Sequence, residues 1–234
     1  LELCEDALVE IASCCDGIAA IVGLPILTAD GTISAAALIQ DRKVLRYIGK
    51  KYITARREMG FLVPSKGYEY ATIKGHKCAI IVGDDLSRER DFDQSVETVI
   101  SINARKYGKG TMTYRYEMMR NLAFVESKNL VLVNQVGGST DIVYDGTSGA
   151  LNSRGELVLM MKNFEEDFQI FDTKASARPI TIPSTYNDRT RLVYEAARCA
   201  EELWTAPELA EEREAVARQA RRQLERLEER VSIS

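Results

Sequence analysis

Pairs of short apolar runs joined by two or three polar residues restrict the fold of this chain more than any other feature. Runs of this length bounded by turn residues predict β-hairpins. The two clearest pairs are residues 35–40 and 44–48 around Asp41–Arg42–Lys43, and residues 68–73 and 78–82 around Lys74–Gly75–His76. A third set predicts strands at 142–144, 149–151 and 157–161, with turns at Asp145–Gly146 and Arg154–Gly155. Because hairpins join antiparallel strands, the chain must contain antiparallel sheet.

Two segments between these runs have the spacing of amphipathic helices. Residues 1–15 place Leu3, Ala7, Leu8, Ile11 and Ala12 on one face, and residues 111–127 direct Met112, Tyr116, Met119 and Phe124 inward. Apolar runs at 18–27, 96–102 and 130–133 predict buried strands, the first ended by Gly23–Leu24–Pro25. Alternating helices and strands with frequent hairpins predict an α/β fold of the α+β type with mixed sheets.

The composition changes after Thr173 and predicts three parts. Residues 1–172 form the main domain, residues 173–188 a linker marked by Pro179 and Pro183, and residues 189–234 a helical extension. In the extension, residues 205–208 fit a capping box, and an apolar stripe follows at Val216, Ala220, Leu224, Leu227 and Val231. The stripe suits a helix that docks on its own domain or one that forms a coiled coil, and both remain open.

The charge and the cysteines exclude several classes of protein. A formal net charge of −4 and a pI near 5.3 argue against a nucleic-acid partner, which would favour a basic face. No apolar run approaches the roughly 20 residues of a membrane span. The cysteines (Cys4, Cys14, Cys15, Cys78 and Cys199) form no CxxC pair and fit reduced thiols better than a disulfide framework. We therefore expect a cytoplasmic protein with neither a nucleic-acid nor a membrane partner.

Few residues carry a catalytic pattern by themselves. The single histidine, His76, lies in a Lys-Gly-His-Lys turn, where a surface histidine without a chemical role is the better interpretation than a triad member. No His, Cys, Asp or Glu residues have metal-ligand spacing. Residues 108–111 lack the first glycine of a Walker loop, and residues 137–141 have no helical pattern after them, so both are predicted to be loops.

Three stretches resemble the nitrilase superfamily, and the last resembles the glutaminase domain of glutamine-dependent NAD synthetases in particular. Residues 49–53 resemble the Lys-x-His-Leu segment that carries the superfamily's lysine. Residues 57–64 resemble the Asp-Glu-x-x-x-Phe-x-Pro segment that follows it. Residues 133–138, 144–146 and 164–166 read Val-Asn-Gln-Val-Gly-Gly, Tyr-Asp-Gly and Phe-Glu-Glu, an order similar to that of the NAD synthetase domains. The resemblance spans roughly residues 1–172.

The resemblance implies a four-layer αββα sandwich with mixed sheets, truncated here at its N-terminal side and followed by a C-terminal amphipathic helix. It also implies amide hydrolysis by a thiolate nucleophile, a carboxylate base and a cation that holds the oxyanion. Lys50 takes the place of the cation, and Glu58 that of a supporting glutamate. Gly83 stands where the family has the cysteine of an Ile-Cys-Glu-Asp-Leu segment, and the base glutamate would lie upstream of Leu1.

The resemblance places substrate binding at Asn103, Arg105 and Tyr107. The family reads Asn-Ala-Ser-Pro where this chain has Asn103–Ala104–Arg105–Lys106, so a bulky cation replaces a small hydroxyl residue. Cys78 lies inside a predicted strand, and a buried, inert thiol is the better interpretation than a displaced nucleophile.

These assignments make a geometric prediction. If they are right, the Lys50 ammonium should lie beside a carboxylate, Glu58 above all, because a buried lysine needs a counter-charge. It should also lie within about 10 Å of Gly83, one screening length.

The function implied by the resemblance is a glutaminase domain that supplies ammonia for the amidation of nicotinic acid adenine dinucleotide. Because glycine offers no atom to attack a carbonyl, we expect the chain as written to be inactive. Glutamine is the implied substrate, and a synthetase domain and a second copy of the chain are the implied partners. ATP and Mg²⁺ would belong to the synthetase domain, which leaves no cofactor for this one. The alternative is a noncatalytic nitrilase-fold scaffold or interaction protein. A strand ending in glutamate upstream of Leu1 would favour the enzyme.

Overall fold

The computed structural model describes residues 1–56, 58–108, 110–139, 142–174 and 178–183, and five residues between 191 and 198. The predicted linker is therefore described only in part. The helical extension at 189–234, with its capping box and apolar stripe, lies almost entirely outside the described residues.

The first sheet is antiparallel, in the order β1-β2-β3. Its strands are β1 (Ala19–Thr28), β2 (Gly31–Gln40) and β3 (Lys43–Gly49). The predicted β2–β3 hairpin is confirmed, and its turn holds only Asp41 and Arg42, both with positive φ, so Lys43 already belongs to β3. The strand predicted at residues 18–27 is β1, and it includes Pro25, which is tolerated because β1 is an edge strand. The same edge position leaves β1 half-buried rather than buried.

The second sheet has six strands in the order β11-β10-β7-β6-β5-β4. They are β4 (Glu69–Ile73), β5 (His76–Val82), β6 (Thr98–Asn103), β7 (Asn129–Asn134), β10 (Gly149–Leu151) and β11 (Leu157–Met160). The three central strands, β5, β6 and β7, run parallel and the others antiparallel, so the expectation of a mixed sheet is confirmed. Parallel strands end at the same sheet edge, and such an edge is where α/β proteins bind their ligands.

One part of the predicted closing hairpin is wrong. β9 (Ile142–Asp145) pairs with β8 (Val136–Ser139) and not with β10. The sequence predicted a loop at residues 137–141, because no helical pattern follows them. Their two consecutive glycines also have low strand propensity, so the pattern gave no sign of β8. Gly137 has a φ of 108°, which suits glycine and few other residues, so the pairing survives there despite the composition.

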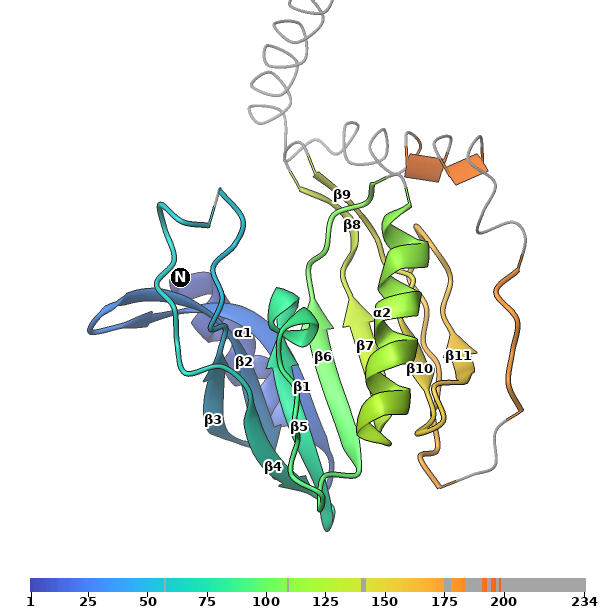
Figure 1. The fold of residues 1–234 in the computed structure, drawn as a ribbon. Coiled ribbons are helices and arrows are strands. Elements are labelled where there is room, and N and C mark those ends of the chain that lie inside the picture. Colours follow the sequence, from blue (N-terminus) through green and yellow to red (C-terminus); the bar gives the residue numbers. More distant parts are fainter. Residues whose placement is uncertain are drawn as a thin grey trace, which may run out of the picture.

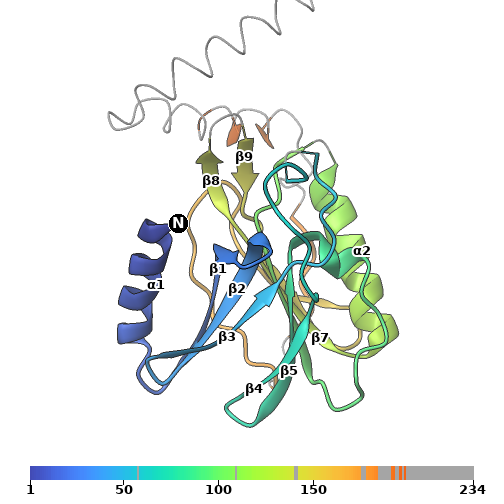
Figure 2. The same cartoon turned by 90° about the vertical axis from the view of Figure 1, so that its left-hand side faces the viewer.

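Helices α1 (Glu2–Cys14) and α2 (Thr111–Glu126) lie on opposite outer sides of the three-stranded and six-stranded sheets (Figures 1 and 2). The alternation of side chains along β2 explains why the layers follow the order helix, sheet, sheet, helix. Ala37 and Ile39 face α1 in one cluster, whereas Ala36 and Leu38 face the six-stranded sheet in another. On the far side of that sheet, α2 packs in the largest buried cluster. The predicted α/β class is confirmed.

Both helices bury less of their predicted apolar faces than expected. In α1 only Leu8 and Ala12 are buried, where they pack against Ala37 and Ile39 of β2, and Leu3 is 84% exposed. In α2 the predicted Met119 is buried, but Phe124 is 65% exposed. At about 100° per residue, the stripe through Met119 continues at Ala123 rather than at Phe124. Within the described residues, no helix has the length and apolarity needed to cross a membrane.

Candidate functional site

Three predicted residues meet where β3 and β5 end. Lys50 directly follows β3, and Gly83 directly follows β5. Lys50 is 4% exposed, and its Nζ donates to both carboxylate oxygens of Glu58, at 2.9 and 2.7 Å. A Cβ atom placed on Gly83 would lie 3.5 Å from the same Nζ. The structure thus brings Lys50, Glu58 and Gly83 together across 33 residues of sequence.

The backbone around Lys50 explains why a glycine precedes it. The N–H of Lys50 donates to the Ser34 carbonyl, and the N–H of Ser65 donates to the Lys50 carbonyl, both at 2.8 Å. This second bond draws the 62–65 segment so close that a Cβ on Gly49 would lie 2.4 Å from the Ser65 side chain. Gly49 therefore lets two backbones approach where the lysine leaves the sheet.

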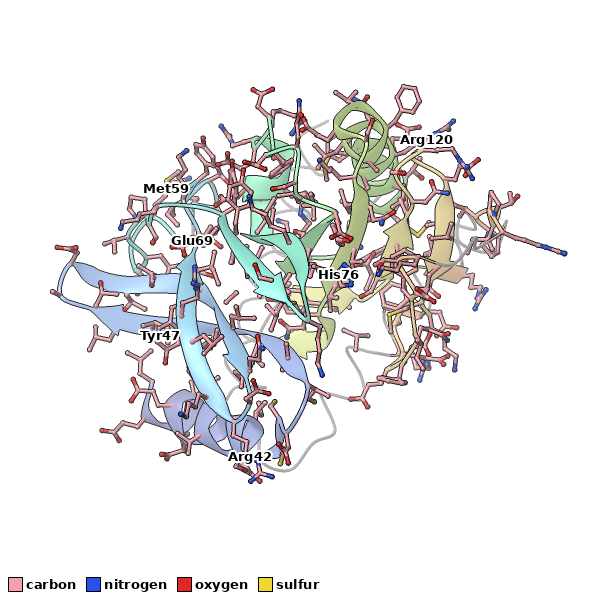
Figure 3. The ribbon with its side chains drawn as sticks, turned by 90° about the horizontal axis from the view of Figure 1, so that it is seen from below. Arg42, Tyr47, Met59, Glu69, His76 and Arg120 are labelled. Atoms are coloured by element: carbon pink, nitrogen blue, oxygen red, sulfur yellow. The ribbon has the colours of Figure 1, made fainter. Side chains whose placement is uncertain are left out.

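Glu58 belongs to a turn pinned to the first sheet. Its N–H donates to the Ala55 carbonyl at 2.9 Å, and its own carbonyl accepts the N–H of Leu62 at 2.8 Å. Val63 then bonds back to Thr32 at the start of β2. Met59, the next residue, points outward at the tip of this loop (Figure 3). Arg57 lies outside the described residues.

Gly83 opens a short 3-10 turn (Gly83–Ser87) in the left-handed conformation, with a φ of 62°. An added Cβ would meet only the Lys50 side chain, at 3.4 to 3.6 Å, which is ordinary van der Waals contact. A small side chain therefore fits the space at residue 83, and its backbone would cost about 1–2 kcal/mol. The position faces an ammonium group and offers no nucleophile.

An ion pair joins this turn to the segment predicted to bind substrate. The Arg105 guanidinium lies 2.6 Å from the Asp84 carboxylate, and Asp84 also accepts a bond from the Thr54 hydroxyl. The Arg105 Nε and the Asn103 Oδ1 are buried without a hydrogen-bond partner among the described residues. Arg105 therefore contacts the turn that begins at Gly83, whereas Asn103 is the last residue of β6, the strand that pairs with β5.

Tyr107 has other neighbours. Its ring packs edge-on against Phe164 at 5.2 Å, and its N–H donates to the Val143 carbonyl. Burial, and then the Asp145 carboxylate, raise the pKa of its phenol. The structure thus places Tyr107 on the β8–β9 side, in contact with Phe164 and Val143.

Sequence reasoning missed a buried polar network that holds Arg105. The Asn134 side-chain amide accepts the N–H of Arg105 at 2.8 Å and donates to its carbonyl at 3.3 Å. Asn134 also donates to Asp145, which forms a fully buried ion pair with Arg115 of α2 at 3.0 Å. Asn134 and Asp145 stand inside the Val-Asn-Gln and Tyr-Asp-Gly stretches of the resemblance. Their place in these family-like stretches indicated that the two residues matter, but the sequence did not show that Asp145 pairs with Arg115 of α2.

His76 and Cys78 lie at the other end of β5. His76 begins the strand that Gly83 follows, and its Nδ1 lies 2.8 Å from the Glu97 carboxylate (Figure 3). Cys78 is 6% exposed, and its thiol pKa is raised, first by burial and then by Glu97. A buried thiol of this kind stays protonated and unreactive at neutral pH.

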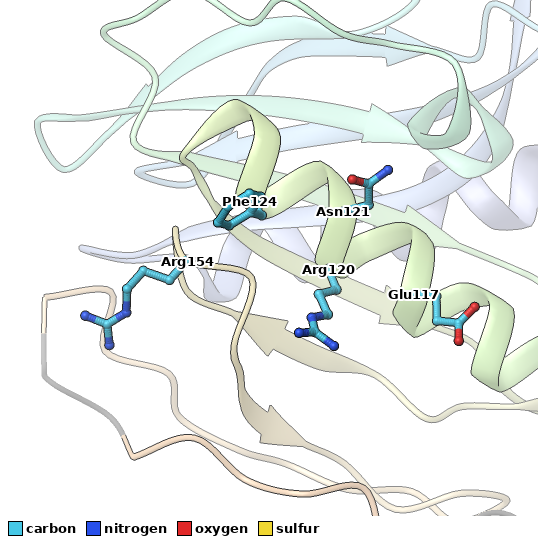
Figure 4. Close-up of a pocket in the computed structure, with 5 residues that line it drawn as sticks. All are labelled: Glu117, Arg120, Asn121, Phe124 and Arg154. Carbon is cyan, nitrogen blue, oxygen red and sulfur yellow. The ribbon is translucent and has the colours of Figure 1, made fainter.

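Within the part of the chain that is described, no group of three or more His, Cys, Asp or Glu residues could hold a metal ion. A cavity of about 330 Å³ lies between α2 and the β10–β11 turn (Figure 4). It is lined by Glu117, Arg120, Asn121, Phe124 and Arg154. None of these residues belongs to the Lys50–Gly83 site.

Comparison with known proteins gives relatives of one kind. The chain is 26% identical over 172 residues to the glutamine-dependent NAD(+) synthetase of Acinetobacter baylyi, covering 70% of this chain and 32% of the relative. It is 28% identical over 167 residues to that of Synechocystis, covering 63% and 30%. The chain thus spans about a third of the length of these relatives. No family model matches it.

Solved structures agree with the sequence relatives. The glutamine-dependent NAD+ synthetase of Acinetobacter baumannii superposes with a TM-score of 0.71 at 25% identity, over 87% of this chain and 41% of that one. A carbon-nitrogen hydrolase of Helicobacter pylori superposes with a TM-score of 0.62 at 17% identity, over 70% and 66%. The second likeness shows the fold alone.

The fold is therefore that of the carbon–nitrogen hydrolases of the nitrilase superfamily. Within that fold, the chain is a homologue of glutamine-dependent NAD synthetases and matches their nitrilase-like domain, as its motifs predict.

Proposed function

We propose that this chain is the glutaminase-type domain of a glutamine-dependent NAD synthetase in which Gly83 stands at the nucleophile's position, so that it does not hydrolyse glutamine. One observation carries the proposal. The Lys50 ammonium, ion-paired to Glu58, lies 3.5 Å from the point where a side chain at residue 83 would begin. A cation at that distance suits the stabilisation of an oxyanion on a substrate attacked from residue 83.

The residues present at the site leave out one step of amide hydrolysis, the nucleophilic attack. Amide hydrolysis begins when a thiolate attacks the carbonyl carbon, and Lys50 and Glu58 provide charge for that step but no attacking atom. Cys78 does not replace it, because its thiol is buried near the start of β5. Arg105, tied to Asp84, stands where a small hydroxyl residue would help to hold glutamine.

In the full-length relatives, the proposed role of this domain is to supply ammonia to a synthetase domain. That domain would amidate nicotinic acid adenine dinucleotide and would hold the ATP and Mg²⁺, with glutamine as the ammonia donor. The chain covers 32% of the first relative, and the synthetase domain is the partner that this proposal implies. We place the protein in the cytoplasm, where NAD synthesis would use it.

A noncatalytic scaffold is the second candidate. Gly83 favours it, because an amide hydrolase without a nucleophile retains only its fold and its surfaces. A scaffold of this kind would bind its partner equally well with Lys50 replaced, whereas a glutaminase-type domain would use the Lys50 site.

Substitution of Gly83 by cysteine tests whether the site is built for a nucleophile. A neighbouring cation lowers the pKa of a thiol, from about 8.5 to values of about 7.5 or below. We expect the introduced thiol to show such a pKa, measured from the pH dependence of its alkylation rate. The alkylated position is identified by mass spectrometry, which separates it from the four described native cysteines and Cys199.

The matched control is the double variant Gly83→Cys/Lys50→Met, which keeps the thiol and removes the cation. Its thiol pKa should return to about 8.5 or above. If the single variant already has an ordinary thiol pKa, or if Lys50→Met leaves the lowered pKa unchanged, Lys50 does not face residue 83 and the proposed site is wrong.

We also propose that the chain forms a homo-oligomer across the outer face of α2. Tyr114, Phe124 and Val125 are each more than 60% exposed there, and Glu117 and Arg120 lie between them. Two antiparallel copies of α2 would place Glu117 of one copy opposite Arg120 of the other, a self-complementary arrangement.

Light scattering at tens of micromolar should therefore report a dimer or a larger species. Phe124→Glu should shift it toward the monomer, because it places a charge in the apolar contact. Leu45→Glu on β3, at a residue of similar exposure (52%), is the control and should leave the mass unchanged. A monomeric wild-type chain would contradict this assembly.

A further inference from the structure

Asp85 is a buried carboxylate that the proposed chemistry does not use. It follows Gly83 by two residues and is 0% exposed. Burial raises the pKa of Asp85, and two backbone N–H groups oppose that shift. A carboxylate this deep is costly unless its oxygens are bonded, so its partners should explain why it is there.

Both partners lie on the segment that follows Lys50. Oδ2 accepts the N–H of Lys51 at 2.7 Å, and Oδ1 accepts the N–H of Tyr52 at 2.9 Å. The two bonds join parts of the chain that are 34 and 33 residues apart. They bridge the turn that begins at Gly83 and the loop that begins at Lys50. These N–H groups belong to residues past the end of β3, where strand pairing no longer fixes the backbone.

We propose that Asp85 is a positioning residue, which ties the Lys51–Tyr52 backbone to the Gly83 turn and thereby holds the Lys50 ammonium over residue 83. The inference rests on the proposed function, because it concerns the distance between the two groups that the function pairs. A carboxylate is well suited to this task, because its two oxygens meet two adjacent N–H groups and so fix orientation as well as distance.

Loss of Asp85 should shift the pKa of a thiol at residue 83 in one direction if Asp85 acts only through its charge, and in the opposite direction if it positions Lys50. The described charged groups around residue 83 and Asp85 are Lys50, Glu58, Asp84, Asp85, Glu89 and Arg105. If Lys50 stayed in place, loss of the Asp85 charge would favour a thiolate at residue 83 and lower the thiol pKa. If Asp85 positions Lys50, its loss moves the cation away and raises the thiol pKa. The direction of the shift decides between them.

The experiment uses the full chain with Gly83→Cys as the reporter. Asp85→Asn is added in one variant and Asp85→Glu in another, and the alkylation rate of the introduced thiol is measured against pH. We expect both to raise the thiol pKa toward that of Gly83→Cys/Lys50→Met. Asp85→Glu is the more telling, because it keeps the charge and changes only the reach of the carboxylate.

The possible failures are distinguishable. If Lys50→Met has no effect in the reporter, the proposed function fails. If Lys50→Met raises the thiol pKa while Asp85→Asn lowers it or Asp85→Glu leaves it unchanged, only the positioning role is overturned.

Hydrogen exchange on the unsubstituted chain keeps the test independent of variant folding. The amides of Lys51 and Tyr52 should be protected like the amides of β3 that pair with β2, because each donates to a buried oxygen. Exchange as fast as that of an exposed loop would overturn the role of Asp85.

Discussion

Replacement of Asp145 by alanine should lower the free energy of unfolding by about 3–5 kcal/mol, the largest single effect that we expect. Asp145 and Arg115 form an ion pair whose side chains are 3% and 1% exposed. Without the carboxylate, the Arg115 guanidinium stays buried and keeps, among the described residues, one hydrogen bond, to the Gly146 carbonyl. Asn134 also loses an acceptor. Urea unfolding followed by circular dichroism measures the change.

The chain provides a matched control in a second arginine–aspartate pair. Arg42 and Asp16 lie 2.7 Å apart but are 59% and 73% exposed. Asp16→Ala should therefore cost less than about 1 kcal/mol, because water replaces the lost partner. Arg115→Met should recover part of the loss in the Asp145→Ala background, since it removes the unpaired charge. Equal costs for Asp145→Ala and Asp16→Ala would contradict the buried network.

Replacement of Glu58 by alanine should lower the free energy of unfolding by about 3 kcal/mol, the lower end for breaking a buried pair. The Lys50 side chain is 5% exposed and that of Glu58 29%, so the ammonium is the more deeply buried partner. Loss of the carboxylate leaves that charge without its main counter-ion. The same urea titration reports the change.

Two control variants test whether the loss of stability comes from the Lys50–Glu58 ion pair itself. Lys50→Met/Glu58→Ala should be more stable than Glu58→Ala alone, because the double variant buries no unpaired charge. Glu69→Ala serves as the surface reference, because Glu69 is 37% exposed and pairs with Arg46 at 3.5 Å. It should cost less than about 1 kcal/mol. If Lys50→Met worsens the Glu58→Ala variant, the lysine does not depend on Glu58 as described.

Local patterns predicted the parts of the fold that depend on neighbouring residues. The β2–β3 and β4–β5 hairpins were predicted because their turns lie between apolar runs, and Met119 was predicted to be buried from helical periodicity. Phe124 was misplaced, because a step of five residues from Met119 turns it about 140° away from the buried face. The β8–β9 pairing was missed because its glycines carry no strand signal.

Only the residues that lie in family-like motifs were predicted as parts of the site. Lys50, Glu58 and Gly83 came from resemblance, and their convergence depends on the packing of two sheets that no local pattern encodes. Asp85 was missed because its partners are the backbone N–H groups of residues 33 and 34 positions away. Asn134 looked like part of a signature, and only the structure reveals that it holds the backbone of Arg105.

Ammonia release from glutamine tests the central claim most directly. The purified chain should release none above the background without protein, because residue 83 is a glycine and the described cysteines lie on α1, directly after it, or near the start of β5. The assay is run in parallel on Lys50→Ala and on Cys78→Ser. Turnover that is lost with Cys78→Ser would place the nucleophile at Cys78. Turnover that persists in Lys50→Ala would contradict the whole site assignment.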